Sequence, residues 1–395
     1  MRRILLVDCD QFFVQCARLA DPDGAGREPL LLVGGSAAGR GVVTSASYET
    51  RAFGVRSGMP TATAQRLCPK AVVVPVPRSL CGEKSRAIRD VLEHFTPVVE
   101  PASIDEAYLD MSGTERLYHD EPLADTARRI QADVLRDTNI HVSIGGGTNR
   151  LVAKLAVSRA KPAGVHIVPP GDEAAFLSTH DIGDIPGVGP VLTAELAKYG
   201  LMRIPDALPM TEAQLVALLG DGRGPWLYRR MRGIDDSALD TRGMAKSLSR
   251  DETFPRDLHT EAELLRELRV LVRRLAADLR ADELRARTIT VRLRDSDFRT
   301  RQASRTIQEA IQTDRGIYTV ARALLARLRA ERRIAARLIG VSASKLTSAD
   351  DTQLTLLDGT TPLESERERR LARVADEVRR KYGPDAIAPG DSYAP

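Results

Sequence analysis

Short apolar runs separated by amphipathic stretches organise the first 170 residues of the chain. Runs bounded by polar or turn residues predict strands, whereas apolar positions three and four apart predict helices. The expected strands are 4–7, 98–100, 106–110, 142–144 and 165–168, and the expected later helices are 123–136 and 151–160. A long insertion, roughly 11–95, follows the first strand and contains a helix, a strand near 30–33 and a helix that ends at Gly54. This order predicts a mixed α+β domain.

The chain becomes mostly helical from about residue 170, in a part that includes "DIPGVGPVLTAEL". Residues 229–246 are rich in turn formers and lack periodic hydrophobicity, so we expect a linker there. A second mixed module follows. Thr260 and Glu263 predict a capping box that opens a helix with a leucine-rich face. In "TITVRLR", alternation predicts a half-buried strand with Arg292 and Arg294 on its outer face.

The C-terminal part of the sequence contains a helical pattern at 317–333 and a strand pattern in "RLIGVSAS". After residue 346 the chain is polar, apart from the island "QLTLL" at 353–357. A charged helix is expected near 364–382, and its stripe of apolar side chains is interpreted as a packing face. The stripe consists of Leu371, Val374, Val378 and Tyr382.

Length and composition narrow the class of protein. A chain of 395 residues and 43.2 kDa is long enough for two or more domains. The apolar start of the chain is interrupted by Asp8, so we expect no export signal, and no segment has the roughly 18 apolar residues of a membrane span. Its four cysteines lack metal-ligand spacing, which is typical of free thiols in the cytoplasm.

Basic residues are concentrated in one part of the chain. The net charge is only +4, yet residues 246–345 contain 23 Lys and Arg against 14 Asp and Glu. A local basic excess suggests a polyanionic partner. A solvated helical surface would have the same composition, and charge alone leaves both interpretations open.

The sequence "SIDEAYLD" places two acids, Asp105 and Glu106, at the start of an expected strand. Strict alternation would put one of them on an apolar face, where an unpaired carboxylate is costly. Asp8 also lies at a strand end, and three carboxylates at one edge of a sheet would suit Mg²⁺. Alternatively, Asp8 and Asp10 cap the next helix and Glu106 is a surface residue; for Asp10 we expect the capping role. The carboxylates alone do not decide between metal site and caps.

Five segments in order resemble one known family. "VDCDQFF", "SYETRAFGVRSGMP", "SIDEAYLD", "SIGGGTNRLVAKLAVSRAKPAG" and "DIPGVG" are similar to Y-family DNA polymerases of the bacterial DNA polymerase IV type, over residues 4–346. The resemblance implies a right-hand α+β fold with a ferredoxin-like βαββαβ palm and a separate α/β little finger. The implied domains are palm (1–10 and 78–168), fingers (11–77), helical thumb with a helix-hairpin-helix (169–233), linker (234–245), little finger (246–346) and tail (347–395).

The resemblance also implies roles for individual residues. Asp8, Asp105 and Glu106, with the backbone carbonyl of Cys9, would hold two Mg²⁺ ions. Phe13 would be the steric gate that excludes a 2′-hydroxyl. The other implied dNTP-binding residues are Phe12, Tyr48, Arg51 and Lys161. The implied DNA-binding residues are Gly187, Gly189, Arg292, Arg294, Arg299, Arg301 and Arg305. "QLTLL" resembles a sliding-clamp-binding peptide without its usual final aromatic, and its implied contacts are Gln353, Leu354, Leu356 and Leu357.

The implied function is translesion DNA synthesis: two-metal transfer of a nucleotide from a dNTP to a primer 3′-hydroxyl, with low fidelity and no proofreading. Primer-template DNA, dNTP and the sliding clamp are the expected partners of a cytoplasmic monomer that does not bind membranes. Two alternatives are a catalytically silent DNA- and clamp-binding accessory, which would have lost the acids, and a nucleotide cyclase, which would need neither the hairpin nor the basic module.

Overall fold

The chain divides into two compact units, Met1–Arg242 and Gly243–Pro395. The computed structural model describes residues 2–241, 245–349, 363–383 and 386–387. The division falls inside the linker expected at 234–245. None of the helices in the described ranges combines the length and the apolarity that crossing a lipid bilayer would require.

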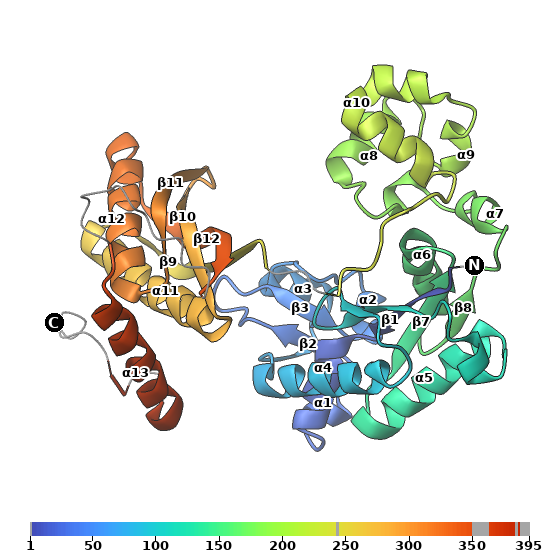
Figure 1. Ribbon diagram of the computed structural model, residues 1–395, viewed down its shortest axis with the longest axis horizontal. Coiled ribbons are helices and arrows are strands. Elements are labelled where there is room, and N and C mark those ends of the chain that lie inside the picture. Colours follow the sequence, from blue (N-terminus) through green and yellow to red (C-terminus); the bar gives the residue numbers. More distant parts are fainter. Residues whose placement is uncertain (1, 242–244, 350–362, 384–385, 388–395) are drawn as a thin grey trace. The chain divides into compact units, whose positions relative to one another are not determined.

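A five-stranded sheet of order β5-β6-β1-β7-β8 is the centre of the first unit (Figure 1). The central strand β1 (Ile4–Cys9) is buried throughout and pairs antiparallel with β6 (Glu106–Asp110) and β7 (Val142–Gly147). The outer strands are β5 (Val99–Pro101) and β8 (Val165–Ile167). The predicted α+β class is confirmed.

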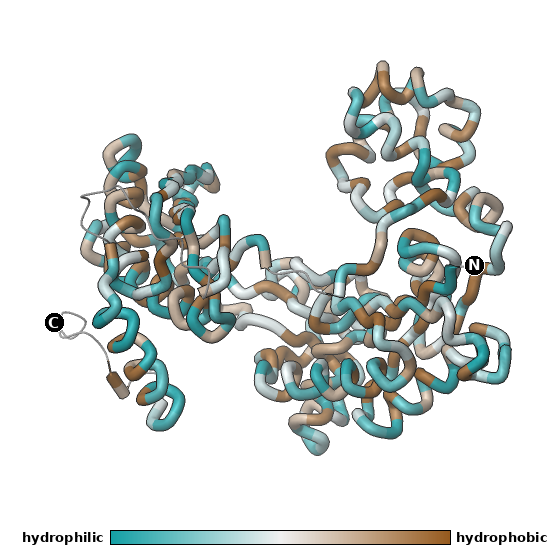
Figure 2. The backbone as a smooth tube through the Cα atoms, viewed as in Figure 1, coloured by the Kyte–Doolittle hydropathy of each residue, from teal (hydrophilic) through white to brown (hydrophobic). Residues whose placement is uncertain are grey.

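Helices cover both faces of this central sheet. Alternate residues of β1 pack against α4 (Arg78–Glu93) and α5 (Leu123–Thr138) on one face and against α6 (Arg150–Ala160) on the other. The strand β7 continues through three glycines because α6 lies very close: a Cβ at Gly145 would be 2.2 Å from the backbone nitrogen of Val157. In Figure 2 apolar and polar segments alternate along the backbone of this unit.

The insertion after β1 forms a small sheet of its own, of order β3-β2-β4. Its elements are α1 (Phe12–Ala20), β2 (Leu31–Gly34), β3 (Val43–Ala46), α2 (Tyr48–Arg51), α3 (Thr61–Leu67) and β4 (Val72–Val74). The strands β3 and β4 were not predicted, because each has only three or four residues and no clear alternation.

A helical part completes the first unit, with an apolar core that it shares with α6. Its helices are α7 (Glu173–Leu177), α8 (Pro190–Ala197), α9 (Ile204–Ala207) and α10 (Glu212–Arg230). The chain after α10 is held against the central sheet: Glu100 forms a bidentate ion pair with Arg150 and accepts a 2.6 Å bond from the Asp240 amide. Part of the expected linker is therefore anchored.

The second unit has a four-stranded antiparallel sheet of order β11-β10-β12-β9, with two helices on one face (Figure 1). Its elements are β9 (Ser247–Leu258), α11 (Glu261–Ala281), β10 (Leu284–Asp295), β11 (Thr300–Ile311), α12 (Asp314–Glu331) and β12 (Ala336–Ser348). The capping box of Thr260 and Glu263 is present, and β10 alternates as predicted.

The last helix, α13 (Glu366–Tyr382), is attached to this unit by polar contacts. Arg280, whose side chain is 4% exposed, pairs with Asp376, and buried Glu364 accepts bonds from the backbone at 312 and 313. The predicted apolar stripe is not a packing face within the described residues: Leu371 and Tyr382 are 66% and 67% exposed. The polar contacts of Arg280 and Glu364 hold the helix to the unit, and Leu371 and Tyr382 remain exposed to solvent.

All four cysteines are buried free thiols, as expected: Cys9, Cys16, Cys68 and Cys81. Burial raises the pKa of Cys9, Cys16 and Cys81 above the ordinary thiol value. A buried thiol favours its neutral form, because the apolar surroundings solvate a thiolate poorly.

Candidate active site

One edge of the central sheet brings together the acids that the sequence singled out. Asp8 and Glu106 are direct cross-strand partners in the β1–β6 pair. The backbone of Cys9 continues this pairing by donating a 2.9 Å hydrogen bond to the carbonyl of Asp105. Antiparallel pairing therefore places the end of one strand beside the beginning of the other, which is the arrangement expected from the sequence.

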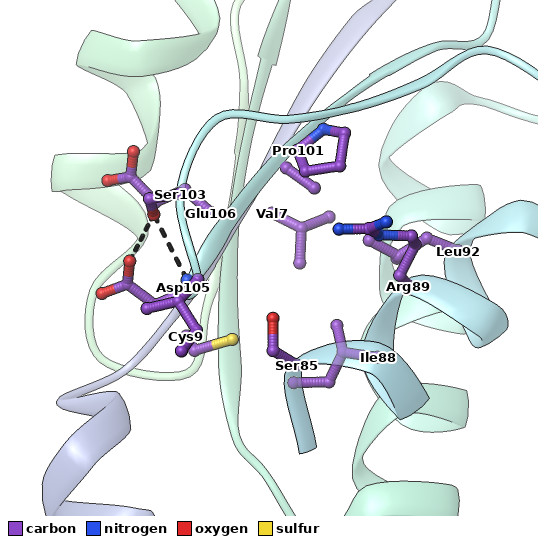
Figure 3. A pocket seen from close by; sticks show the side chains of 12 residues that line it. Val7, Cys9, Ser85, Ile88, Arg89, Leu92, Pro101, Ser103, Asp105 and Glu106 are labelled. Carbon is purple, nitrogen blue, oxygen red and sulfur yellow. Dashed lines mark hydrogen bonds between the residues drawn. The ribbon is translucent and has the colours of Figure 1, made fainter. Parts of the chain in front are cut away.

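Asp105 and Glu106 project to the same side of the strand, away from the apolar residues Val7, Ile88 and Leu92 (Figure 3). Asp105 precedes β6, so the bend at Ser103 frees it from strict alternation. Its carboxylate accepts a hydrogen bond from the Ser103 hydroxyl. In the described parts of the chain, no three His, Cys, Asp or Glu side chains stand in a ready metal-binding cluster. The edge thus pairs Asp8 with Glu106 directly, while Asp105 contacts Ser103.

Two lysines from α6 and its C-terminal end reach this acidic edge. The Lys161 ammonium lies 2.6 Å from Asp8, and Lys154 forms an ion pair with Glu106. Residues seven apart share a helix face, so both side chains approach from the same direction. Lys161 was predicted as a nucleotide contact, whereas Lys154 was missed; the seven-residue spacing was the available signal.

Burial and the two lysines shift the pKa values of the acids at this edge. Burial raises the pKa of Asp8 from 3.8 to about 7; Lys161 opposes this shift and Glu106 adds to it. For Glu106, burial also opposes ionisation, but the hydrogen bond and charge of Lys154 outweigh it and hold the pKa below the ordinary value. Hard carboxylate oxygens whose present partners are ammonium groups fit a divalent oxygen-seeking ion such as Mg²⁺.

The insertion contributes an aromatic pair and a tyrosine–arginine pair. The Phe12 side chain is buried in the core at 1% exposure, so a nucleotide could contact only the backbone of this residue. Phe13 is half-buried, with its ring edge-on to Phe12 at 5.5 Å. The Arg51 guanidinium lies over the Tyr48 ring, 4.9 Å from its centroid. Burial and a hydrogen bond to Asp10 raise the pKa of Tyr48 above its ordinary value.

Asp10 does not cap the following helix, contrary to the expectation from sequence. The N-cap of α1 is Gln11, whose backbone is left-handed (φ 41°) and whose side chain makes no capping bond. The Asp10 carboxylate is 3% exposed and accepts hydrogen bonds from Tyr48, Ser143 and the amide of Ala163. Sequence reasoning assigned Asp10 to a local role, but its partners are distant in sequence.

The face of the second sheet opposite its helices is polar and basic. Arg292 and Arg294 lie on this open face; Arg292 is half exposed and lies 3.6 Å from Asp251. Hydroxyl side chains form two cross-strand rows beside them. The rows are Ser304, Thr290, Ser342 and Ser249, and Thr306, Thr288, Ser344 and Ser247. Small hydroxyls and arginines are common phosphate contacts in nucleic-acid-binding proteins.

Two of the five arginines predicted to bind DNA do not lie on the open face, although Arg305 is exposed to solvent. Arg301 and Arg305 pair across strands with Leu293 and Ile289, which are buried, and directly paired residues share a face. The Arg301 side chain is 10% exposed and forms an ion pair with fully buried Asp295. Its prediction as a phosphate contact is corrected, because the guanidinium is committed to the core of the unit.

The remaining predicted positions have varied surroundings. Arg299 is exposed in the β10–β11 turn. Gly187 has a φ of +100° and lies against Trp226, 2.8 Å from an added Cβ, while Gly189 is the N-cap of α8. A tight turn that requires glycine therefore precedes α8, as the hairpin motif predicted. The clamp-binding segment 353–357 lies outside the described residues.

Comparison with known proteins places the chain in a family. Residues 7–158 match the model of the impB/mucB/samB family, and residues 245–356 match that of its C-terminal domain. The chain is 36% identical to a protein of Desulfatibacillum aliphaticivorans named DNA polymerase IV, over 98% of this chain and 96% of that protein. It is 34% identical to one of the same name from Caulobacter vibrioides, over 97% and 92%.

Solved structures agree with the sequence comparison. A Y-family DNA polymerase chimera (Dbh-Dpo4(243-245)-Dbh) has a TM-score of 0.79 at 26% identity, covering 87% of this chain and 98% of that one. An insertion ternary complex of Dbh DNA polymerase has a TM-score of 0.62 at 26% identity with the same coverage. The chain therefore belongs to the impB/mucB/samB family, and its resemblance to Y-family DNA polymerases is confirmed.

Proposed function

We propose that the protein is a template-directed DNA polymerase for translesion synthesis, which joins a nucleotide from a dNTP to a primer 3′-hydroxyl and releases pyrophosphate. The observation that carries this proposal is the pairing of Asp8 with Glu106 at the sheet edge, where Lys154 and Lys161 meet them. The relatives named DNA polymerase IV and the polymerase ternary complex support the same activity.

The residues at this edge have different proposed roles in the reaction. Asp8, Asp105, Glu106 and the Cys9 carbonyl would hold two Mg²⁺ ions, which polarise the reacting phosphate and the attacking hydroxyl when bound. The Cys9 side chain is buried at 4% exposure, so only its backbone is available to the site. Lys161 can neutralise charge on the triphosphate once Asp8 has another cationic partner.

The other predicted contacts extend the proposal to sugar and DNA. Phe13 is half-buried in the helix that follows the strand of Asp8, and a rigid ring there can reject a 2′-hydroxyl by contact. The open face of the second sheet and the hairpin glycines Gly187 and Gly189 are proposed to bind the backbone of primer-template DNA. We further propose that the protein acts in the cytoplasm as a monomer.

A primer-extension assay tests the activity directly. The wild-type protein is incubated with primer-template DNA and dNTPs, with Mg²⁺ or with EDTA. Extension that requires Mg²⁺ supports the polymerase. DNA binding without extension would instead support the catalytically silent accessory, and a cyclic product from one nucleotide without DNA would support the cyclase.

The same assay can include the clamp-binding peptide. Because 353–357 resembles a clamp-binding segment in sequence, we propose that it tethers the polymerase to a sliding clamp. Deleting these five residues should reduce clamp-stimulated extension and leave basal extension unchanged. Equal stimulation of the two forms would refute the tether without affecting the polymerase proposal.

A further inference from the structure

A buried carboxylate connects the insertion to the central sheet. Asp10 Oδ1 accepts hydrogen bonds from the Tyr48 hydroxyl at 2.7 Å and from the Ser143 hydroxyl at 2.9 Å. Its Oδ2 accepts the same Ser143 hydroxyl at 2.9 Å and the Ala163 amide at 2.7 Å. The three donors belong to α2, to β7 and to the segment after α6, so one side chain joins three separate parts of the unit.

The bond from Tyr48 fixes a residue whose other donor is also occupied. The Tyr48 amide donates to the side chain of Gln11 at 2.9 Å. Gln11 adopts its left-handed backbone in making this contact, and such a conformation persists only where the surroundings enforce it. Asp10 and Gln11 therefore hold Tyr48 from opposite ends.

The fixed Tyr48 in turn orients an arginine. The Arg51 guanidinium lies over the Tyr48 ring, and its Nε donates to the Ala46 carbonyl at 3.0 Å. The Ala163 amide bonded to Asp10 is two residues from Lys161, whose ammonium meets Asp8. One carboxylate thus supports both cationic side chains that are expected to contact the triphosphate.

We propose that Asp10 is a positioning residue for the incoming nucleotide, which acts through Tyr48 on Arg51 and through the Ala163 amide on Lys161. The proposal rests on the proposed polymerase function and adds to it the means by which the triphosphate site is held in shape before the substrate arrives. It requires no contact between Asp10 and metal, nucleotide or DNA.

Two conservative variants test this chain of contacts. Asp10→Asn exchanges one carboxylate oxygen for an amide that cannot accept a hydrogen bond, and Tyr48→Phe removes the hydroxyl from the other side. Single-nucleotide extension should show a KM for dNTP about 10-fold higher in each, with kcat changed much less, because the nucleotide must then order Tyr48 and Arg51 when it binds. Asp137→Asn, an exposed aspartate paired with Arg136, is the matched control and should behave as wild type.

The double variant distinguishes positioning from a general structural role. Because Asp10 acts partly through Tyr48 and partly through the Ala163 amide, adding Asp10→Asn to Tyr48→Phe should raise the KM by a smaller factor than Asp10→Asn causes alone. Fully multiplicative effects, a fall in kcat at unchanged KM, or a loss of DNA affinity would each overturn the proposal. An unaltered KM in Tyr48→Phe would overturn it even if Asp10→Asn does not fold. Absence of extension by the wild type would instead contradict the polymerase function.

Discussion

The acidic edge of the first unit and the open face of the second are both polar, but they are built in opposite ways. At the edge, Asp8 and Glu106 are largely withdrawn from water and each contacts a lysine, so burial and charge shift their pKa values. On the open face, Arg292 is half exposed among short hydroxyl side chains. Buried charges interact strongly and depend on position, whereas exposed ones are screened. Single substitutions should therefore have large effects at the edge and small, salt-dependent effects on the face.

The largest effect is expected for Asp8→Asn. Extension should fall roughly 1,000-fold or more, because several kcal/mol of transition-state stabilisation depend on bound cations. DNA affinity should be retained, and Asp110→Asn at the opposite end of the same strand pair is the control. Extension within 10-fold of wild type would mean that the acidic edge is not the catalytic centre.

The same variant should be more stable than the wild type in EDTA. Because burial raises the pKa of Asp8 from 3.8 to about 7, folding takes up a proton between these values. The stabilisation from that proton is fully present below about pH 4 and is lost as the pH rises through about 7. Asparagine does not titrate, so the gain in Tm should grow over this range. A gain that does not depend on pH would show that the carboxylate is not destabilised by burial.

An intermediate effect is expected at Phe13, the proposed steric gate. Phe13→Ala should raise ribonucleotide incorporation relative to deoxyribonucleotide incorporation by roughly 10- to 100-fold, since contact exclusion of one hydroxyl has about this strength. Phe298→Ala, which removes an exposed ring from the second unit, should leave sugar selectivity unchanged. If the two variants incorporated ribonucleotides equally often relative to deoxyribonucleotides, Phe13 would be a packing residue and not a steric gate.

The smallest effects are expected on the open face. Arg292→Ala and Arg294→Ala should each weaken DNA binding about 2- to 5-fold, as for an exposed ion pair. Each should also lower the slope of log affinity against log salt by about one. Arg315→Ala, 80% exposed on α12, is the control. If Arg315→Ala lost as much affinity for DNA as either variant, DNA binding would depend on the net charge of the protein and not on the arginines of the open face.

The sequence predicted those features that depend on local pattern. The acids of "SIDEAYLD", the capping box at Thr260 and the alternation of β10 are all visible in a few neighbouring residues. The strand β9 was missed because "SLSRDETFPRDL" is polar and contains a proline. Arg301 was predicted to contact phosphate, but the face on which it lies depends on the register of its strand with β10, across a turn.

Long-range contacts explain the remaining differences at the site. Asp10 was expected to cap a helix, but its hydrogen-bond partners lie 38, 133 and 153 residues away along the chain. Nothing in the local pattern distinguishes a capping carboxylate from one that joins three segments. Lys154 could have been found from its spacing to Lys161, since the two share a helix face on the side of the acids.

The burial of all four native thiols has a practical consequence for labelling. Maleimides and iodoacetamides react with the thiolate, and its fraction at neutral pH is minute where burial has raised the pKa, as at Cys9, Cys16 and Cys81. A cysteine introduced at an exposed position would therefore react much faster than the native ones. The wild-type background could thus accept a pair of fluorophores, one on each unit, without prior removal of its own sulfhydryls.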